Sequence, residues 1–470
     1  MGAGAILEPL LVIVLLFGGT WINRTTSSVS SAHRTRRKSS SYRATSPDSI
    51  ESGFSSSSPK DELLGSRSSS PSTSLSARDP WRKRRIGIFS WTCEVTAPNT
   101  VVFKDRVLSR LLRKLPFLAE CWYWALVYWT YQLGRAFTAV TLQEGTIDVA
   151  RKHALRLIEI EQALGLFCEV PIQRFFLQRP VLMKYTNWIY SFIHIPGTIA
   201  FLVWLYYYTT TLNRVDDSQP GKPQGVMSGS PAGPLLYQAR RRTLAVCNLL
   251  AFVVFTIWPC MPPRLLSDEN VSGPQGKLAR SYGFVDTVHG EKGAGSVWTE
   301  NRFCNQYAAM PSLHFGYSLM IGLTILTIPL PVHHRRRTRI RLGSIGFQIP
   351  SWRRMACLFL GVAYPFTILV AIVATANHFI LDAIAGAVVC TVGWKFNGIL
   401  LNLIPVEDYF LWLVRIHKPD PAEMTRVTDI DGWIDDDDDD AAPTEYSSSS
   451  PCSFPCHSSL RNSPSHSYSP

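Results

Sequence analysis

The chain has 470 residues and a formal net charge of +12. Its length would allow two or three soluble domains, but apolar residues are concentrated in residues 115–404, whereas residues 24–80 are rich in Ser. Because the basic residues form short clusters beside apolar runs, their placement is typical of membrane anchoring and argues against nucleic-acid binding.

The first apolar run, residues 5–22, fits either a cleaved signal peptide or a membrane span. No Lys or Arg precedes it, and Glu8 lies at its start, which is unusual for a signal peptide. Cleavage would also leave the following arm in the lumen, although its basic cluster at 82–85 favours the cytosol. We therefore predict that residues 1–23 form an uncleaved transmembrane segment with its N-terminus outside.

Residues 24–114 follow as a predicted disordered, Ser-rich cytosolic arm with a basic end beside the membrane, because its Ser-rich part contains too few large apolar residues to bury a core. Residues 405–470, which include an acidic run at 435–440, are predicted to be a disordered, acidic and Ser-rich cytosolic tail.

Residues 115–404 predict an all-α fold, a polytopic transmembrane helix bundle with six core spans in addition to the N-terminal one. Each apolar run approaches the roughly 20 residues that a helix needs to cross a bilayer. The six spans are predicted near residues 115–133, 187–209, 243–260, 308–329, 355–376 and 379–403. This region is the predicted membrane phosphatase or phosphotransferase domain, for the reasons given below.

Residues 146–178, between the first two core spans, alternate charged and apolar residues. This pattern is typical of an amphipathic helix that lies along a membrane surface. Pro171 is expected to break or kink this helix.

The basic clusters predict which side of the membrane each loop faces. Segments 211–242 and 331–354 are rich in Arg and should be cytosolic, whereas loop 261–306 mixes both charges and should be lumenal. Cys260 and Cys304 flank this loop, and a disulfide between them would require the loop to be lumenal.

Two segments carry the candidate chemistry, AAMPSLHFGYSLMIG at 308–322 and ANHFILDAIAGAV at 376–388. His378 and Asp382 are four residues apart, so on a helix they share a face. A carboxylate that accepts a proton from one imidazole nitrogen leaves the other nitrogen free to attack. His314 and His378 each begin a predicted span on the same side of the membrane, so we expect the two rings to meet.

Phosphate binding is predicted at the same place. Pro311 suits a first helical turn, so the backbone N–H groups of Ser312 and Leu313 would be free beside His314 to bind an anion. Arg264, in CMPPRLL at 260–266, ends the third span on this side and would supply a cation. His194 fits equally well facing this site or a neighbouring helix.

These residues resemble the type 2 phosphatidic acid phosphatase superfamily over residues 115–404. The PSLH, His-x3-Asp, PPR and GFVD (283–286) sequences look like those of the fungal inositol phosphorylceramide synthase branch, which are inositolphosphotransferases. The resemblance implies that His378 is the nucleophile that forms a phosphohistidine, with Asp382 orienting it. It also implies that His314 protonates the leaving oxygen and that Arg264 neutralises phosphate charge.

Three positions depart from the superfamily pattern. Ile257 stands where the first motif has Lys, Ile372 where the third has Arg, and Leu313 where Gly is usual. The phosphate site must therefore use other groups, for which the candidates are Arg264, Arg302, Asn305 and Asn377. For the two Asn residues, an ordinary capping role fits as well.

The leading hypothesis is a lipid phosphotransferase that moves phosphoinositol from phosphatidylinositol to a ceramide-like alcohol, with no metal or other cofactor. The alternatives are a lipid phosphate phosphatase and, in another class, a catalytically silent membrane scaffold or transporter. We expect an integral membrane protein of the Golgi or endoplasmic reticulum, acting in sphingolipid metabolism, with its site facing the lumen and lipids as partners.

Overall fold

The computed structural model describes residues 4–25, 79–88, 90–141, 145–213, 230–287, 307–331, 334, 338–342 and 345–420. Arg302, Cys304 and Asn305 lie outside the described residues, as does most of the predicted arm and tail. The expectations for these residues, including the Cys260–Cys304 disulfide, stay predictions.

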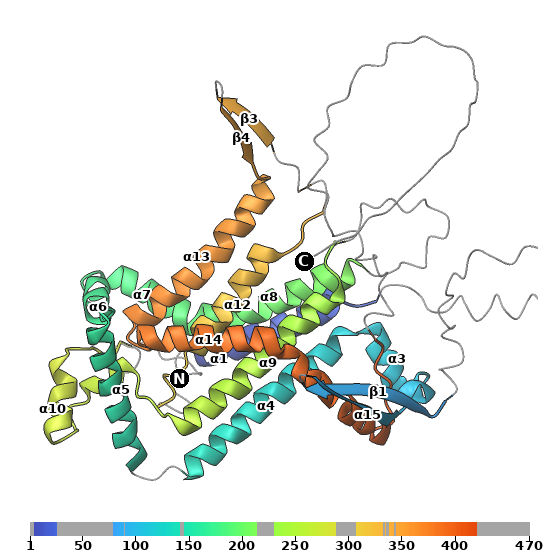
Figure 1. The fold of residues 1–470 in the computed structure, drawn as a ribbon, viewed down its shortest axis with the longest axis horizontal. Helices are drawn as coiled ribbons and strands as arrows, with labels where there is room; N and C mark the ends of the chain where they lie inside the picture. Colours follow the sequence, from blue (N-terminus) through green and yellow to red (C-terminus); the bar gives the residue numbers. More distant parts are fainter. Residues whose placement is uncertain are drawn as a thin grey trace, which may run out of the picture. The chain divides into compact units, whose positions relative to one another are not determined.

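The described chain is mostly helical, and a helix overlaps each of the six predicted core spans (Figure 1). These helices are α4 (Phe117–Thr141), the run from α7 (Pro180–Trp188) through α8 (His194–Tyr206) to Thr211, α9 (Pro234–Ile257), α12 (Leu313–Thr327), α13 (Trp352–Ala374) and α14 (Ile380–Phe396). The predicted N-terminal span is α1 (Gly4–Ile22).

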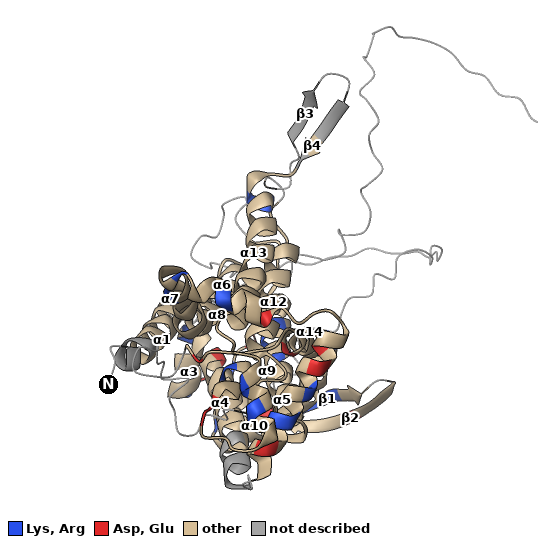
Figure 2. Ribbon diagram, turned by 90° about the vertical axis from the view of Figure 1, so that its left-hand side faces the viewer, with Lys and Arg blue, Asp and Glu red and all other residues tan. Residues whose placement is uncertain are grey.

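Among the described residues, three helical runs are long and apolar enough to cross a membrane: Pro180–Thr211, Trp352–Ala374 and Ile380–Leu413. The apolar helices Pro9–Ile22 and Leu313–Thr327 are shorter. The charged residues of α13, Arg353 and Arg354, both lie in its first turn (Figure 2). The rest of that helix is thus compatible with a hydrocarbon environment.

Helix α12 packs closely against both α13 and α14 because glycines face each other at the crossings. A β-carbon at Gly322 would lie 2.4 Å from the carbonyl oxygen of Gly361 on α13, and one at Gly386 on α14 would lie 2.2 Å from that of Ser312. Small residues of this kind let helix backbones approach closely in membrane proteins. The N-terminal ends of α12 and α14 are therefore held together.

The predicted amphipathic helix is two helices, α5 (Gly145–Ala163) and α6 (Glu169–Leu177). The break is not at Pro171, which fits the first turn of α6, where a missing N–H costs nothing. It lies at Gly165, whose φ of +68° favours glycine and ends α5. Ala154 and Ile158 of α5 pack with Phe379, at the start of α14, in one apolar cluster.

Residues 81–88 and 90–114, expected to belong to a disordered arm, are ordered. Strands β1 (Trp81–Ile88) and β2 (Trp91–Pro98) form an antiparallel hairpin, followed by the short 3-10 helix η1 (Thr100–Phe103) and α3 (Val107–Lys114). The expectation failed because long-range contacts, rather than local composition, order this segment. Arg82 and Arg84 both form ion pairs with Asp408.

Asp408 lies on α15 (Ile404–Leu413), which is likewise ordered within the predicted tail and follows α14 through the 3-10 helix η6 (Asn397–Leu403). The hairpin and α15 thus lie at the C-terminal end of α14, and α5 contacts its other end. Four further elements are η4 (Pro263–Ser267), α10 (Pro274–Ser281) and the strands β3 (Thr338–Leu342) and β4 (Ile345–Ile349), which pair as an antiparallel hairpin.

Candidate active site

His378 lies in the short turn between α13 and α14. The backbone N–H groups of Asn377 and His378 both donate to the carbonyl oxygen of Ile372, at 3.0 and 3.3 Å, and Ala376 adopts a positive φ of 51°. The turn is therefore tight, and it holds His378 in the interior with only 7% of its surface exposed.

The Nδ1 atom of His378 lies 2.8 Å from the carbonyl oxygen of Ala309. Because a carbonyl oxygen only accepts hydrogen bonds, Nδ1 must carry the proton in this contact. In the neutral ring, Nε2 then has a free lone pair, which is the state required of a nitrogen nucleophile.

This contact corrects one detail of the sequence-based interpretation. Asp382 Oδ2 lies 3.7 Å from His378 Nδ1, within the range of an ion pair but too far for a hydrogen bond. Asp382 Oδ2 instead accepts a 2.8 Å hydrogen bond from the N–H of Phe379. The hydrogen bond that orients the imidazole comes from Ala309, while Asp382 stabilises the start of α14 beside it.

His314 meets His378 as expected, with their ring centroids 5.5 Å apart. It occupies the first turn of α12, whose N-cap Ser312 accepts a 3.4 Å hydrogen bond from the N–H of Phe315. Two rings from the α7–α8 run also approach His314: that of Tyr190 at 4.7 Å and that of His194 at 5.1 Å.

His194, for which the sequence left two roles open, therefore lies at the site. Its Nδ1 atom contacts the hydroxyl of Tyr364 at 3.1 Å, which also ties it to α13. Spacing within its own span gave no sign of this placement, because the contacts come from residues more than a hundred positions away.

The start of α12 differs from the expectation in two ways. Helix α12 begins at Leu313, so Pro311 precedes the helix instead of occupying its first turn. The N–H of Ser312 is not free, because it donates a 2.9 Å hydrogen bond to the carbonyl oxygen of Asp382. Ser312 therefore joins the two histidine motifs, and its N–H is not available to phosphate in this structure. Phosphate binding by Leu313 stays a prediction.

Arg264 lies against the turn that carries His378. Its backbone N–H donates to the carbonyl oxygen of Ala376 at 2.9 Å, and its Nε donates to Asn377 Oδ1 at 2.9 Å. Its Nη1 also forms a 3.1 Å ion pair with Asp286, the last residue of GFVD. A buried arginine held from several directions keeps its guanidinium in one place.

The side-chain amide of Asn377 binds protein groups, unlike that of a residue that donates directly to phosphate. Its Oδ1 accepts from Arg264, and its Nδ2 donates to Thr375 Oγ1 at 2.8 Å. The amide holds the arginine, so in this structure its contribution to phosphate binding is indirect.

Backbone hydrogen bonds bring the CMPPRLL segment at 260–266 to the same place. The N–H of Cys260 donates to the carbonyl oxygen of Tyr307, and the N–H of Ala309 donates to that of Cys260, at 2.9 and 3.1 Å. The segment that begins CMPPRLL therefore runs beside the segment that precedes His314. Sequence reasoning missed Ala309, because a carbonyl group leaves no signature in residue type.

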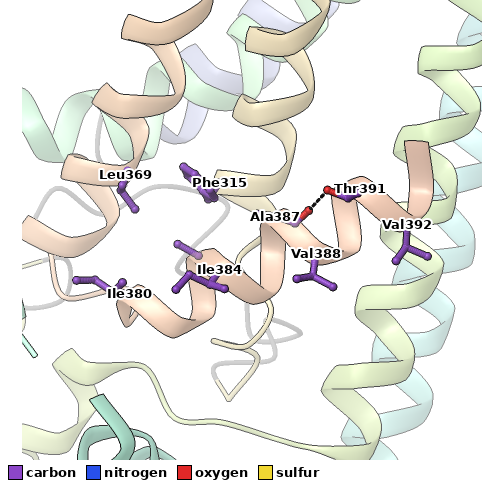
Figure 3. A pocket seen from close by; sticks show the side chains of 9 residues that line it. Phe315, Leu369, Ile380, Ile384, Ala387, Val388, Thr391 and Val392 are labelled. Atoms are coloured by element: carbon purple, nitrogen blue, oxygen red, sulfur yellow. Dashed lines mark hydrogen bonds between the residues drawn. The ribbon is translucent and has the colours of Figure 1, made fainter. Parts of the chain in front are cut away.

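An apolar groove lies among α12, α13 and α14. It has a volume of about 360 Å³ and is lined by Phe315, Leu369, Ile380, Ala383, Ile384, Ala387, Val388, Thr391 and Val392. Leu369 of α13 and Phe315 of α12 project toward a row of apolar side chains along α14 (Figure 3). The hydroxyl of Thr391 donates to the carbonyl oxygen of Ala387 at 2.8 Å, so the groove presents a hydrocarbon surface.

Comparisons with known proteins agree with the motifs. The family model described as PAP2 superfamily matches residues 155–215, 232–339 and 345–396, which include both histidines, Asp382 and Arg264. No curated protein and no solved structure matches the chain. Together with the apolar helices, the match indicates an integral membrane protein with lipid substrates. It supports the assignment of the chain to the type 2 phosphatidic acid phosphatase superfamily of phosphatases and phosphotransferases.

Proposed function

We propose that the protein is a membrane lipid phosphotransferase that works through a phosphohistidine on His378. The observation that carries this proposal is the 2.8 Å contact between His378 Nδ1 and the Ala309 carbonyl, with the His314 ring 5.5 Å away. One imidazole is oriented to attack phosphorus, and the second is close enough to exchange a proton with a departing oxygen.

In the first step, Nε2 of His378 attacks phosphorus and the bond from phosphorus to the donor lipid's oxygen breaks. His314 gives its proton to that oxygen, and Arg264 balances the phosphate charge. In the second step, an acceptor hydroxyl attacks phosphorus, returns a proton to His314 and releases His378. Atoms and charge balance in both steps without a further reactant.

The groove supports a lipid as donor. Phe315 directly follows His314, and Ile380 lies two residues after His378, so two of the residues that line the groove are close to the histidines along the chain. A donor with its phosphate at the histidines would lay an acyl chain along α14, where burial contributes about 0.8 kcal/mol per methylene group.

For the substrates, we propose phosphatidylinositol as donor and a ceramide-like alcohol as acceptor. The PSLH, PPR and GFVD sequences, which look like those of inositolphosphotransferases, support this choice. Purified protein should convert labelled phosphatidylinositol to a labelled inositolphospholipid only when ceramide is present. Release of labelled inositol phosphate into water, with or without ceramide, would reject the transferase and favour the phosphatase.

The His378→Ala variant separates either enzyme from a silent scaffold or transporter. We expect this variant to purify normally and to have no turnover. Equal turnover by wild type and variant would reject a catalytic His378.

We further propose six core spans plus α1, with the histidines facing the lumen of the Golgi or endoplasmic reticulum. The contact between Thr25, just after α1, and Lys114, just before α4, supports this topology, because both then lie at one end of the bundle. A glycan acceptor placed in loop 265–300 should be modified in cells. Cytosolic accessibility of a tag there would reject the orientation, and imaging of a tagged chain would test the organelle.

A further inference from the structure

The first turn of α14 is stabilised by carboxyl groups from a distant part of the chain. The N–H of Ile380 donates to Glu169 Oε1 at 3.0 Å, and that of Leu381 donates to Glu161 Oε1 at 2.8 Å. Asp382 Oδ2 accepts a hydrogen bond from the N–H of Phe379. The first N–H groups of a helix have no partner within the helix, so these three carboxyl groups satisfy donors that burial would otherwise leave unpaired.

All three carboxyl groups are fully buried, and this makes their charge expensive. The second oxygen of each glutamate, Oε2, has no hydrogen-bond donor among the described residues. Two buried carboxylates cannot both ionise cheaply side by side, and a single proton shared between them removes the conflict. That proton would also give both Oε2 atoms a partner.

The helices of the two glutamates indicate which one holds the proton. Glu161 lies in the last turn of α5, where the helix dipole disfavours a negative charge, whereas Glu169 is the first residue of α6, where the dipole favours one. Burial, followed by the hydrogen bond and the charge of Glu169, raises the pKa of Glu161 to about 9. The position of Glu161 at the end of α5 and its raised pKa both favour a protonated Glu161.

We propose that Glu161 and Glu169 form a proton-sharing pair of positioning residues that holds the first turn of α14 and thereby fixes His378. This role rests on the proposed function of His378 as nucleophile. The pair acts through the backbone, since His378 directly precedes Phe379 and is only two residues from Ile380. Its shared proton also limits the negative charge beside a site that must accept an anionic phosphate.

The break at Gly165 allows both glutamates to reach α14. The turn from Leu164 to Cys168 interrupts the helix between α5 and α6, and residues eight positions apart both reach the start of α14. One straight helix would place Glu161 and Glu169 about 12 Å apart along its axis.

Measurements of kcat and KM on variants of Glu161 test this positioning role. Glu161→Gln keeps an oxygen acceptor for Leu381 and an N–H donor for Glu169, so its kcat at neutral pH should stay within about threefold of wild type. Glu161→Ala removes both and should lower kcat roughly 10–100-fold with KM within about twofold, as expected when a reacting group is misplaced. Glu159→Gln, on the exposed side of α5, is the matched control and should behave as wild type.

Two kinetic results would overturn the proposal: an unchanged kcat in a folded Glu161→Ala protein, or a loss in Glu161→Gln as large as that in Glu161→Ala. Should the Ala variant not fold, the Gln variant still decides through its pH profile. Wild-type kcat should fall above about pH 9, as the shared proton leaves. The Gln variant should lack that fall, and retention of the fall would contradict the shared proton.

An infrared measurement does not depend on turnover, so it distinguishes failure of this proposal from failure of the proposed function. The wild-type minus Glu161→Gln spectrum at neutral pH should show the carbonyl stretch of a protonated carboxylic acid, and the wild-type minus Glu159→Gln spectrum should not. Absence of that band would reject the shared proton even in an active enzyme. Presence of the band in a protein without turnover would reject the proposed function of His378 but not the shared proton.

Discussion

The N–H of Ser312 donates a 2.9 Å hydrogen bond to the carbonyl oxygen of Asp382, so the two histidine motifs are joined through their backbones. Gly386, one turn further along α14, allows this approach because a β-carbon there would lie 2.2 Å from the carbonyl oxygen of Ser312. The distance between His314 and His378 therefore depends on a residue without a side chain.

Gly386→Ala should separate the two helices. The clash is with backbone, which cannot rotate away, so we expect the free energy of unfolding to fall by roughly 1–3 kcal/mol. Turnover should fall with it, as the histidines move apart. Gly398→Ala is the control, since a β-carbon there meets nothing within 4 Å. Thermal unfolding in detergent and a turnover assay measure both effects, and a Gly386→Ala protein with normal values in both would contradict this account of the crossing.

Replacement of each histidine should have a different effect on covalent labelling and turnover. His378→Ala removes the nucleophile, so labelled donor lipid should leave no label on the protein. His314→Ala removes only the proton exchange and should lower turnover roughly 10²–10⁴-fold while still permitting some labelling. His417→Ala, beside Thr100 near the β1–β2 hairpin, is the control. Labelling of the His378→Ala protein equal to wild type would place the covalent step elsewhere.

Asn377→Ala should weaken phosphate binding by releasing Arg264. The Nε of Arg264 would lose its 2.9 Å acceptor, and hydrogen bonds to charged groups contribute about 1.5–3 kcal/mol. We expect KM to rise roughly tenfold or more, with a smaller change in kcat. Thr375→Ser keeps the hydroxyl that accepts from Asn377 and should leave KM unchanged. A rise in KM in both variants would point to general loosening of the turn.

Stability should depend on pH through Glu161. Its pKa is raised from 4.5 to about 9 in the folded protein, so the folded state holds a proton that the unfolded chain releases above about pH 4.5. The contribution is therefore fully present at low pH and is lost progressively as pH rises toward about 9. The groups that face Glu161 are Glu169, Asp382 and the thiols of Cys168 and Cys260.

Unfolding temperatures of wild type and Glu161→Gln, measured across this pH range, isolate that contribution. The wild type should lose stability relative to the variant as pH rises. Parallel curves for the two proteins would show that Glu161 does not change its protonation on folding.

Asp408→Asn should loosen the β1–β2 hairpin without affecting catalysis. Asp408 is buried and accepts from both Arg82 and Arg84, so weakening these contacts should cost roughly 1–3 kcal/mol locally. Limited proteolysis within 81–98 should accelerate while turnover stays within about twofold, since the histidines lie at the other end of α14. Glu94→Gln, which breaks only an exposed pair with Lys83, should change neither.

Much of this protein could be predicted from its sequence because the relevant signals are local. Apolar runs of membrane length located the helices, and the four-residue spacing of His378 and Asp382 predicted that the two residues lie close together, as they do in the turn before α14 and in its first turn. Topology alone also predicted that His314 and His378 would meet, since each begins a span on the same side.

Other features required the folded chain because they depend on contacts between distant residues. Composition did not predict the ordered hairpin at 81–98, which Asp408 stabilises from more than 300 positions away. Charge alternation in 146–178 indicated a surface helix, but two of its glutamates are fully buried against α14.

The sequence by itself determined which residue types carry the chemistry and in which segments of the chain they lie, because periodicity and hydrophobicity are properties of short segments. Tertiary structure decided which atoms act. The carbonyl of Ala309 fixes the proton of His378, the N–H of Ser312 joins the motifs instead of binding phosphate, and Asn377 holds Arg264. Every residue but proline carries the same backbone N–H and carbonyl groups, so only their positions in the folded chain reveal which of them serve the site.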